Sequence, residues 1–146
     1  MSFDGYFWLG VLELLGRGMS QDQASGAAGN AFGREMAPRI ANAIGAVMLG
    51  SRSNEATYGA NRIVIKCAAP NTSSVGVTYI MLVPLHSIFG AFQQADGSFR
   101  VLALSARVYA QVQRATRSQG AAAGKVGLVS RSVFEEKGTH VKTVRV

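Results

Sequence analysis

Residues 54–78, NEATYGANRIVIKCAAPNTSSVGVT, contain the clearest strand signal in the chain. The β-branched run at residues 62–68 is followed by a Pro-Asn pair and three consecutive hydroxyl side chains, which are typical of a turn and a loop. Glu55 lies just before this run and Lys66 lies near its end. A carboxylate and an ammonium that frame an apolar strand are typical of a site built on a β-sheet, and they are equally typical of an ordinary amphipathic strand.

The segment before this strand predicts two helices separated by a loop. Residues 3–15 and 32–49 place large apolar side chains three and four positions apart, as one face of a helix requires. Pro38 conflicts with a continuous second helix, so it either lies in the first turn of a shorter helix or kinks a longer one. Residues 17–30 are rich in Gly, Ser, Gln and Asn and predict a loop, with Asn30 as the cap of the helix that follows.

The remainder of the chain predicts short strands and short helices. A strand begins at residue 75 and continues as a helix that ends near Gly90, and residues 88–104 form a hairpin that turns at Asp96-Gly97. A helix over residues 106–114, capped by Ser105, is followed by a basic glycine-rich loop over residues 115–127. The last elements are a strand over residues 126–129, a helical turn over residues 132–137 closed by Gly138, and a tail that is an edge strand or a loose end.

These elements predict a single domain over residues 1–146, of the α/β or α+β class. We expect a mixed sheet of four to five strands with the helices packed on it. The strand at residues 62–68, the start of residues 75–83 and the hairpin would form this sheet.

The composition excludes a disordered chain and argues against a membrane protein. Hydrophobic residues make up 48% of the chain and charged residues 16%, which is enough apolar material for a core. Cys67 is the single cysteine, so no intramolecular disulfide is possible, and its apolar neighbours predict a buried thiol. Asp4 and Glu13 interrupt the N-terminal apolar run, which therefore predicts neither a signal peptide nor a membrane-spanning helix. We expect a cytoplasmic protein that does not insert into membranes.

The net charge of +7 is concentrated in the last third of the chain. Residues 100–146 hold nine Lys and Arg against two Glu, so this third alone carries a net charge of +7. Such asymmetry predicts a polyanionic partner, nucleic acid before an anionic membrane surface, although a solvated basic face has the same composition. Aromatic residues do not alternate with these cations, so contact with a phosphate backbone is a simpler expectation than stacking on bases. The candidate nucleic-acid-binding residues are Arg107, Arg114, Arg117, Lys125 and Arg131.

Spacing excludes three other kinds of site. The segment 120–125 resembles a phosphate-binding loop, but it holds three residues between its glycines instead of four, and Val126 stands where Ser or Thr would bind magnesium. The two histidines, His86 and His140, are far apart in the sequence and have no Cys, His or carboxylate at ligand spacing, which argues against zinc. No serine lies in a G-x-S-x-G turn, so a hydrolase triad has no support.

The order of charged residues around the central strand resembles the PD-(D/E)xK nuclease superfamily. Glu35 lies on a predicted helix, Glu55 follows it, and Lys66 comes after ten further residues, near the end of a strand. The resemblance covers residues 30–105. It implies that Lys66 and Glu55 are catalytic, that Glu55 and Glu35 bind magnesium, and that the lysine positions the attacking water.

The chain departs from that family's pattern at one position. The family's acidic residue two positions before the lysine is Val64 here, so a central metal ligand is missing. In this superfamily some members carry the carboxylate elsewhere, and others keep the fold without the activity. The resemblance therefore implies either a magnesium-dependent endonuclease or a degenerate, inactive relative.

Two functions of different classes follow from the sequence. The first is nucleic-acid binding, with or without magnesium-dependent cleavage of the backbone. The second is a non-catalytic subunit of a larger homo- or hetero-oligomeric assembly. Its contact surface would be the apolar helix at residues 3–15 and a ridge of small residues at Ala37, Ala41 and Gly45. A nuclease site requires carboxylates close to Lys66, whereas an assembly subunit requires a contiguous exposed apolar patch.

Overall fold

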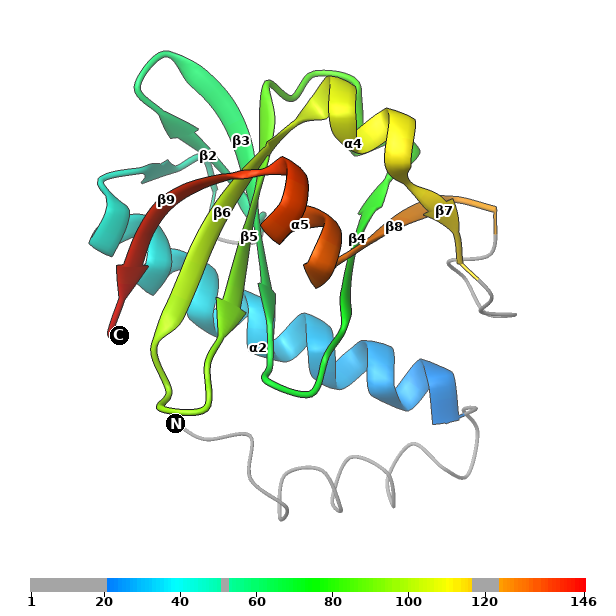
Figure 1. Cartoon of the computed structure of the whole chain (residues 1–146), viewed down its shortest axis with the longest axis horizontal. Helices are drawn as coiled ribbons and strands as arrows, with labels where there is room; N and C mark the ends of the chain where they lie inside the picture. Colours follow the sequence, from blue (N-terminus) through cyan, green and yellow to red (C-terminus); the bar gives the residue numbers. More distant parts are fainter. Residues whose placement is uncertain (1–20, 51–52, 117–123) are drawn as a thin grey trace.

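The predicted central strand lies inside a six-stranded sheet. The structure, a computed structural model, describes residues 21–50, 53–116 and 124–146. The central strand is β3 (Asn61–Ala68), and the strand order is β1-β2-β3-β5-β6-β9 (Figure 1). The other strands are β1 (Val47–Met48), β2 (Glu55–Tyr58), β5 (Ser87–Gln93), β6 (Phe99–Ser105) and β9 (Thr139–Val144). The pair β3–β5 is parallel and every other pair in this sheet is antiparallel.

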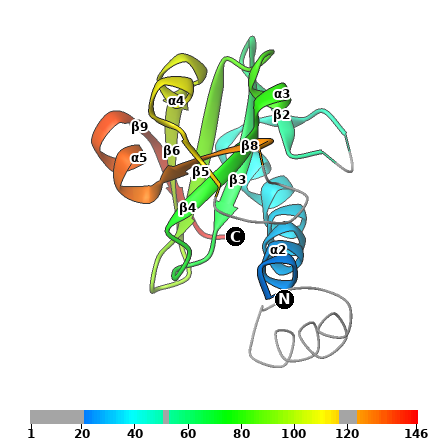
Figure 2. The same cartoon turned by 90° about the vertical axis from the view of Figure 1, so that its right-hand side faces the viewer.

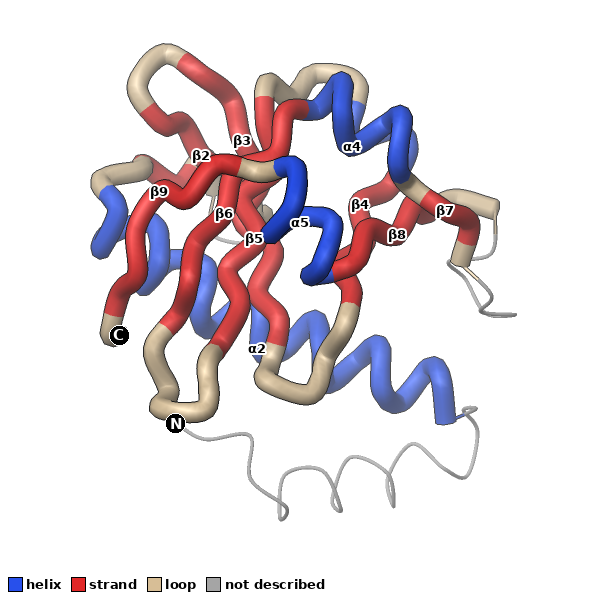
Figure 3. Tube along the Cα trace, in the orientation of Figure 1, coloured by secondary structure: helices blue, strands red, loops and turns tan. Residues whose placement is uncertain are grey.

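A second, three-stranded sheet joins one strand of the crossover between β3 and β5 to two strands from later in the chain (Figure 3). Parallel neighbours require such a crossover, and here it contains β4 (Ser74–Thr78) and the short helix α3 (Tyr79–Leu82). Strand β4 pairs with β8 (Val126–Ser130), which pairs with β7 (Arg114–Ala115). The mixed α and β class is confirmed, but β4 belongs to this second sheet and the main sheet has six strands instead of four to five.

The longest helix is α2 (Gln21–Ile44), and it corrects two predictions. The loop predicted at residues 17–30 is helical from Gln21 onwards, so Asn30 lies inside the helix and is not its cap. Pro38 also lies inside the helix, as the alternative of a longer helix requires. The residues of α2 that pack in the core begin at Phe32, so the Gly-rich segment extends a helix whose packed part lies further along the chain.

Helix α2 ends five residues earlier than predicted. Gly45 follows it with a φ of +83°, a left-handed conformation that glycine adopts without strain, and the Ala46 amide donates to the Ala41 carbonyl at 2.8 Å. The next residues then pair with β2 as strand β1, so Val47 and Met48 are extended and not helical.

Helices cover both faces of the six-stranded sheet (Figure 2). Helix α2 packs on one face, where Ile63 and Ile65 of β3 meet Ile40 in one apolar core. The second sheet, α4 (Ala106–Val112) and α5 (Arg131–Lys137) cover the other face, where Tyr109 and Phe134 are fully buried. Because both faces of β3 are covered, its sequence is a nearly continuous apolar run.

Ala37 and Ala41 of the small-residue ridge are buried in the first core. The ridge therefore allows the chain's own sheet to approach α2 closely, and it is not a surface for a partner. The predicted helix at residues 3–15 lies outside the described residues.

Several local predictions are confirmed. Strands β5 and β6 form the hairpin, with Gly97 at a φ of +87° in its turn. The Ser105 hydroxyl accepts from the Val108 amide and caps α4, Gly138 follows α5, and the tail is the edge strand β9.

Helix α3 ends at Leu82 and not near Gly90, because Pro84 cannot continue a helix and β5 begins at Ser87. No helix in the described part of the chain is long and apolar enough to cross a bilayer.

Candidate functional site

Lys66 lies in a pocket of about 260 Å³ between the N-terminal half of α2 and strand β4. Side chains alternate along β3, so Lys66 shares the face of Val64 and Ala68. Its partner in β5 is Gly90, where a Cβ would lie 2.6 Å from the Phe92 ring, so the space beside Gly90 is filled by aromatic side chains of the second core. The pocket is lined by Gly29, Asn30, Gly33, Asn54, Lys66, Cys67, Thr72, Ser74, Val75 and Gly76.

Neutral hydrogen-bonding groups surround the Lys66 ammonium. The lining contains two amides and two hydroxyls, and none of its residues is acidic. Among the described residues, no carboxylate lies within 4.0 Å of this ammonium. Burial therefore lowers the pKa of Lys66, and the nearby Cys67 opposes that shift only in part. A largely desolvated cation without a counter-charge is costly unless an anion binds beside it.

Two glycines of the lining allow close packing. A Cβ at Gly33 would lie 3.4 Å from the Asn54 amide nitrogen in the pocket, whereas a Cβ at Gly76 would lie only 2.8 Å from a methyl of Val126, outside the pocket. The Cys67 thiol next to Lys66 is partly buried, and desolvation raises its pKa to about 12, so it is neutral near pH 7. Cys67 is therefore a packing residue, as the sequence indicates.

Two of the predicted basic residues donate hydrogen bonds to the loop of residues 69–74, which borders this pocket. On one side, Arg114 Nη2 donates to Ser74 Oγ at 3.0 Å, which places a guanidinium at the pocket edge. On the other side, Arg131 Nη2 donates to the Ala69 carbonyl at 3.1 Å, and the same guanidinium lies 5.0 Å from the centroid of the Phe92 ring. Arg131 therefore holds the loop in place, while the more exposed Arg114 is available to a ligand.

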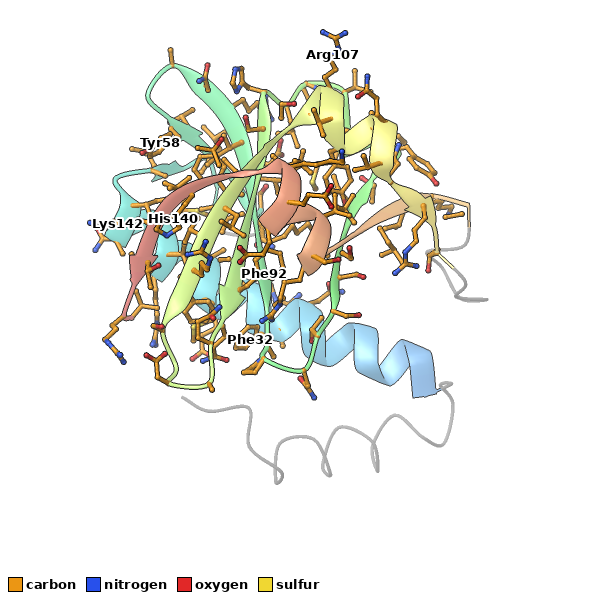
Figure 4. All side chains as sticks on the ribbon, in the orientation of Figure 1. Phe32, Tyr58, Phe92, Arg107, His140 and Lys142 are labelled. Atoms are coloured by element: carbon orange, nitrogen blue, oxygen red, sulfur yellow. The ribbon has the colours of Figure 1, made fainter. Side chains whose placement is uncertain are left out.

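The remaining predicted cations lie apart from Lys66. Lys125 is exposed at the end of the second sheet that is remote from Ser74, because β8 begins opposite Thr78. Arg107 is exposed on α4 and extends away from the molecule (Figure 4). Arg117 lies outside the described residues. The structure thus brings Lys66 and Arg114 together and separates Lys125 and Arg107 from them.

The predicted metal ligands do not lie in the lining of this pocket. Glu55 Oε1 accepts from Arg62 Nε at 3.1 Å, and Glu55 Oε2 accepts from the Ser53 hydroxyl at 3.3 Å. Glu35 Oε1 lies 3.7 Å from Arg39 Nη2, and its other oxygen is buried without a hydrogen-bond partner in the described structure. Both carboxylates therefore face arginines of their own.

The described residues do not fit a magnesium site of the expected kind. They contain no group of three or more His, Cys, Asp or Glu side chains that could hold a metal. Val64, at the position of the family's central carboxylate, is fully buried in the second apolar core, where a charged group would be costly. The metal-binding and catalytic roles of Glu55 and Glu35 stay predictions.

Sequence reasoning missed most of the pocket. Asn30 and Gly33 belong to a helix whose first turns resemble a loop, and Asn54 and Ser74 are ordinary turn residues by their composition. No local signal joins them, because they come from segments that meet only after the crossover has formed.

Comparison of the chain with models of known protein families finds no match, and comparison with curated proteins finds no similar sequence.

Proposed function

We propose that this protein binds nucleic acid through the phosphate backbone, with Lys66 and Arg114 contacting phosphate. The observation that supports the proposal is the largely desolvated Lys66 ammonium, which faces amides and hydroxyls and has no described carboxylate within 4.0 Å. A phosphate would supply the missing negative charge and accept hydrogen bonds from the same groups.

Two further cations of the last third lie apart from this site and would contribute to it only through their long-range charge. Lys125 and Arg107 are exposed and have no acidic partner among the described residues within 4.0 Å. They would attract a polyanion at long range without fixing its position. We further propose that this activity is cytoplasmic.

Binding to a labelled duplex and a labelled single strand across a salt series tests the proposal. Lys66→Met and Arg114→Ala should each weaken binding and each reduce the slope of log K against log salt by about one counterion. The triple change Arg114→Ala, Arg117→Ala and Lys125→Ala should reduce that slope by up to about three counterions.

The matched control is Arg145→Gln, which removes one positive charge beside the Asp96 carboxylate at the β5–β6 turn. It should leave both the affinity and the salt slope nearly unchanged. Equal effects of Arg145→Gln and Arg114→Ala would show that only net charge matters, and they would contradict a site at Lys66.

Magnesium-dependent cleavage remains a separate proposal, which the family resemblance motivates. The same assay with and without magnesium tests it. Cleavage that requires magnesium and is lost in Lys66→Ala, while binding and folding persist, would support it. Binding without cleavage would support a binding protein or a degenerate nuclease fold.

The alternative proposal is a non-catalytic assembly subunit, and one observation favours it. Ile80 and Val83 on and next to α3 are 87% and 84% exposed, although both are large apolar residues. Such exposure is typical of contact surfaces. If the protein self-associates, the double variant Ile80→Ser, Val83→Ser should shift its mass in light scattering to that of the monomer. An unchanged mass would argue against this surface.

A further inference from the structure

A second pocket, of about 370 Å³, lies at the opposite end of β3 from Lys66. It opens on the face of the six-stranded sheet that α2 covers further along, where β3, β5 and β9 begin and β2 and β6 end. Its lining residues are Tyr58, Asn61, Ile63, His86, Ser87, Phe89, Ala103, Thr139, His140 and Val141.

The chain contains two histidines, and both line this pocket. His86 Nδ1 lies 2.8 Å from Ser87 Oγ, and His140 Nε2 lies 3.0 Å from Thr143 Oγ1. Each ring is thus held through one nitrogen. The His140 ring lies on the opposite face of the sheet, because His140 is paired with Leu102 of the second core and hydrogen-bonds to Thr143, whose partner Arg100 contacts Glu135 of α5. Within the described structure, the second nitrogen of the His86 ring makes no hydrogen bond and is available to a ligand.

The pocket has an apolar floor and an aromatic wall. Ile63 and Phe89 are buried at its base. The Tyr58 ring meets Phe89 edge to face, with the ring centroids 5.1 Å apart, and it remains 36% exposed. Tyr58 and His140 lie on the same side of the molecule, away from Arg107 (Figure 4). An exposed aromatic face above an apolar floor favours a flat ligand.

The polar groups of the lining are neutral amide, hydroxyl and imidazole groups. No lining residue is Asp, Glu, Lys or Arg. The amide of Asn61 and the hydroxyl of Thr139 each combine donor and acceptor capacity with the imidazole nitrogens. This lining therefore suits a neutral heterocycle with donors and acceptors on its edge, whereas a phosphate would find no counter-charge.

We propose that this pocket binds one unpaired nucleobase, which lies against Tyr58 and hydrogen-bonds to Asn61 or His86. Aromatic stacking combined with hydrogen bonds to an exposed base edge is the general way in which proteins recognise unpaired bases. The inference rests on the proposed function where the base belongs to a strand. The same chemistry also admits a free nucleoside.

Proton NMR of the histidine rings tests the pocket directly, because His86 lies at the pocket and the His140 ring, on the opposite face of the sheet, is an internal control. The full-length protein is titrated separately with adenosine, guanosine, cytidine and uridine at up to millimolar concentration. Saturable shifts of the His86 ring protons with at least one nucleoside support the proposal. The absence of shifts with all four nucleosides overturns it.

A second experiment places the base in a strand. Tyr58→Ala should weaken binding of a single-stranded oligonucleotide at least about fivefold and leave duplex binding unchanged. Tyr58→Phe keeps the ring and should bind like the wild type. Tyr79→Ala is the matched control, because Tyr79 is 37% exposed but lies on α3 outside the pocket. Equal single-strand affinities for Tyr58→Ala and Tyr79→Ala would overturn the strand-bound form of the proposal.

Failure of the proposed function is distinguishable from failure of this inference. If Lys66→Met and Arg114→Ala do not alter binding to a duplex, the proposal of backbone binding at Lys66 is wrong. The nucleoside titration still tests, independently, whether the second pocket binds a base.

Discussion

At the residue scale, burial of the Lys66 ammonium in the central strand costs free energy, and no ion pair in the described fold offsets that cost. Lys66 is buried enough for desolvation to lower its pKa, and no described carboxylate lies within 4.0 Å of it. Methionine would fill a similar volume without a charge. A residue that lowers stability but is placed among hydrogen-bonding groups is a candidate for binding.

We expect Lys66→Met to raise the free energy of unfolding at pH 7, by an amount on the order of 1 kcal/mol. Because the folded pKa of Lys66 is below its ordinary value of 10.5, the unfolded chain binds more protons between these two values. Wild-type stability should therefore rise as the pH increases through this window, and the variant should lack that rise. Urea unfolding at several alkaline pH values measures both effects. A clear loss of stability at pH 7 would identify Lys66 as a structural residue.

The buried Tyr109 hydroxyl links two strands of the second sheet. It donates to the Gly127 carbonyl at 2.8 Å and lies 3.3 Å from the Val75 carbonyl. We expect Tyr109→Phe to cost about 1–2 kcal/mol, because buried carbonyl groups lose their donor. Tyr79→Phe, on the exposed helix α3, is the control and should change stability very little. Equal urea midpoints for both variants would contradict this role of the hydroxyl.

At the element scale, the β5–β6 hairpin depends on one left-handed residue. Gly97 has a φ of +87°, and a Cβ there would meet nothing within 4 Å. Any cost of Gly97→Ala therefore comes from the backbone conformation and not from a clash. We expect a loss of about 1 kcal/mol in the free energy of unfolding.

Gly50→Ala is the matched control for this turn. A Cβ at Gly50 also meets nothing within 4 Å, but its φ is outside the left-handed region. Denaturant unfolding of the two variants separates backbone strain from the general effect of replacing glycine. A Gly97→Ala protein as stable as Gly50→Ala would show that the turn tolerates another conformation.

At the scale of the whole molecule, the basic last third is integrated into the fold. Strand β9 pairs with β6, and β8 pairs with β4. Phe134 of α5 meets Phe92 of β5 with the ring centroids 5.2 Å apart. Removal of residues 113–146 would expose the second core, make β6 an edge strand of the main sheet and leave β4 without a partner strand.

We therefore expect a chain that ends after residue 112 to lose cooperative unfolding. Near-ultraviolet circular dichroism and urea titration of the truncated chain measure this outcome. A cooperative transition close to that of the full chain would show that residues 113–146 form an appendage, and the basic surface would then be separable from the Lys66 pocket.

The amino-acid sequence by itself determined the local elements of this protein. The β-branched run of β3, the Asp-Gly turn of the hairpin and the serine cap of α4 each depend on neighbouring residues, so local chemistry is sufficient to predict them. The same local chemistry predicted a loop at residues 21–30, which are helical as the first part of α2, whose core-packed residues begin at Phe32.

Only the tertiary structure decided which residues share a site. The crossover after β3 brings Ser74 to the Lys66 pocket, the second sheet brings Arg114 to Ser74, and the sheet register brings Tyr58 and His86 to the second pocket. It also places Glu55 beside Arg62. Strand pairing and crossover geometry are set by the burial of two cores at once, and that burial is a property of the whole chain and not of any segment.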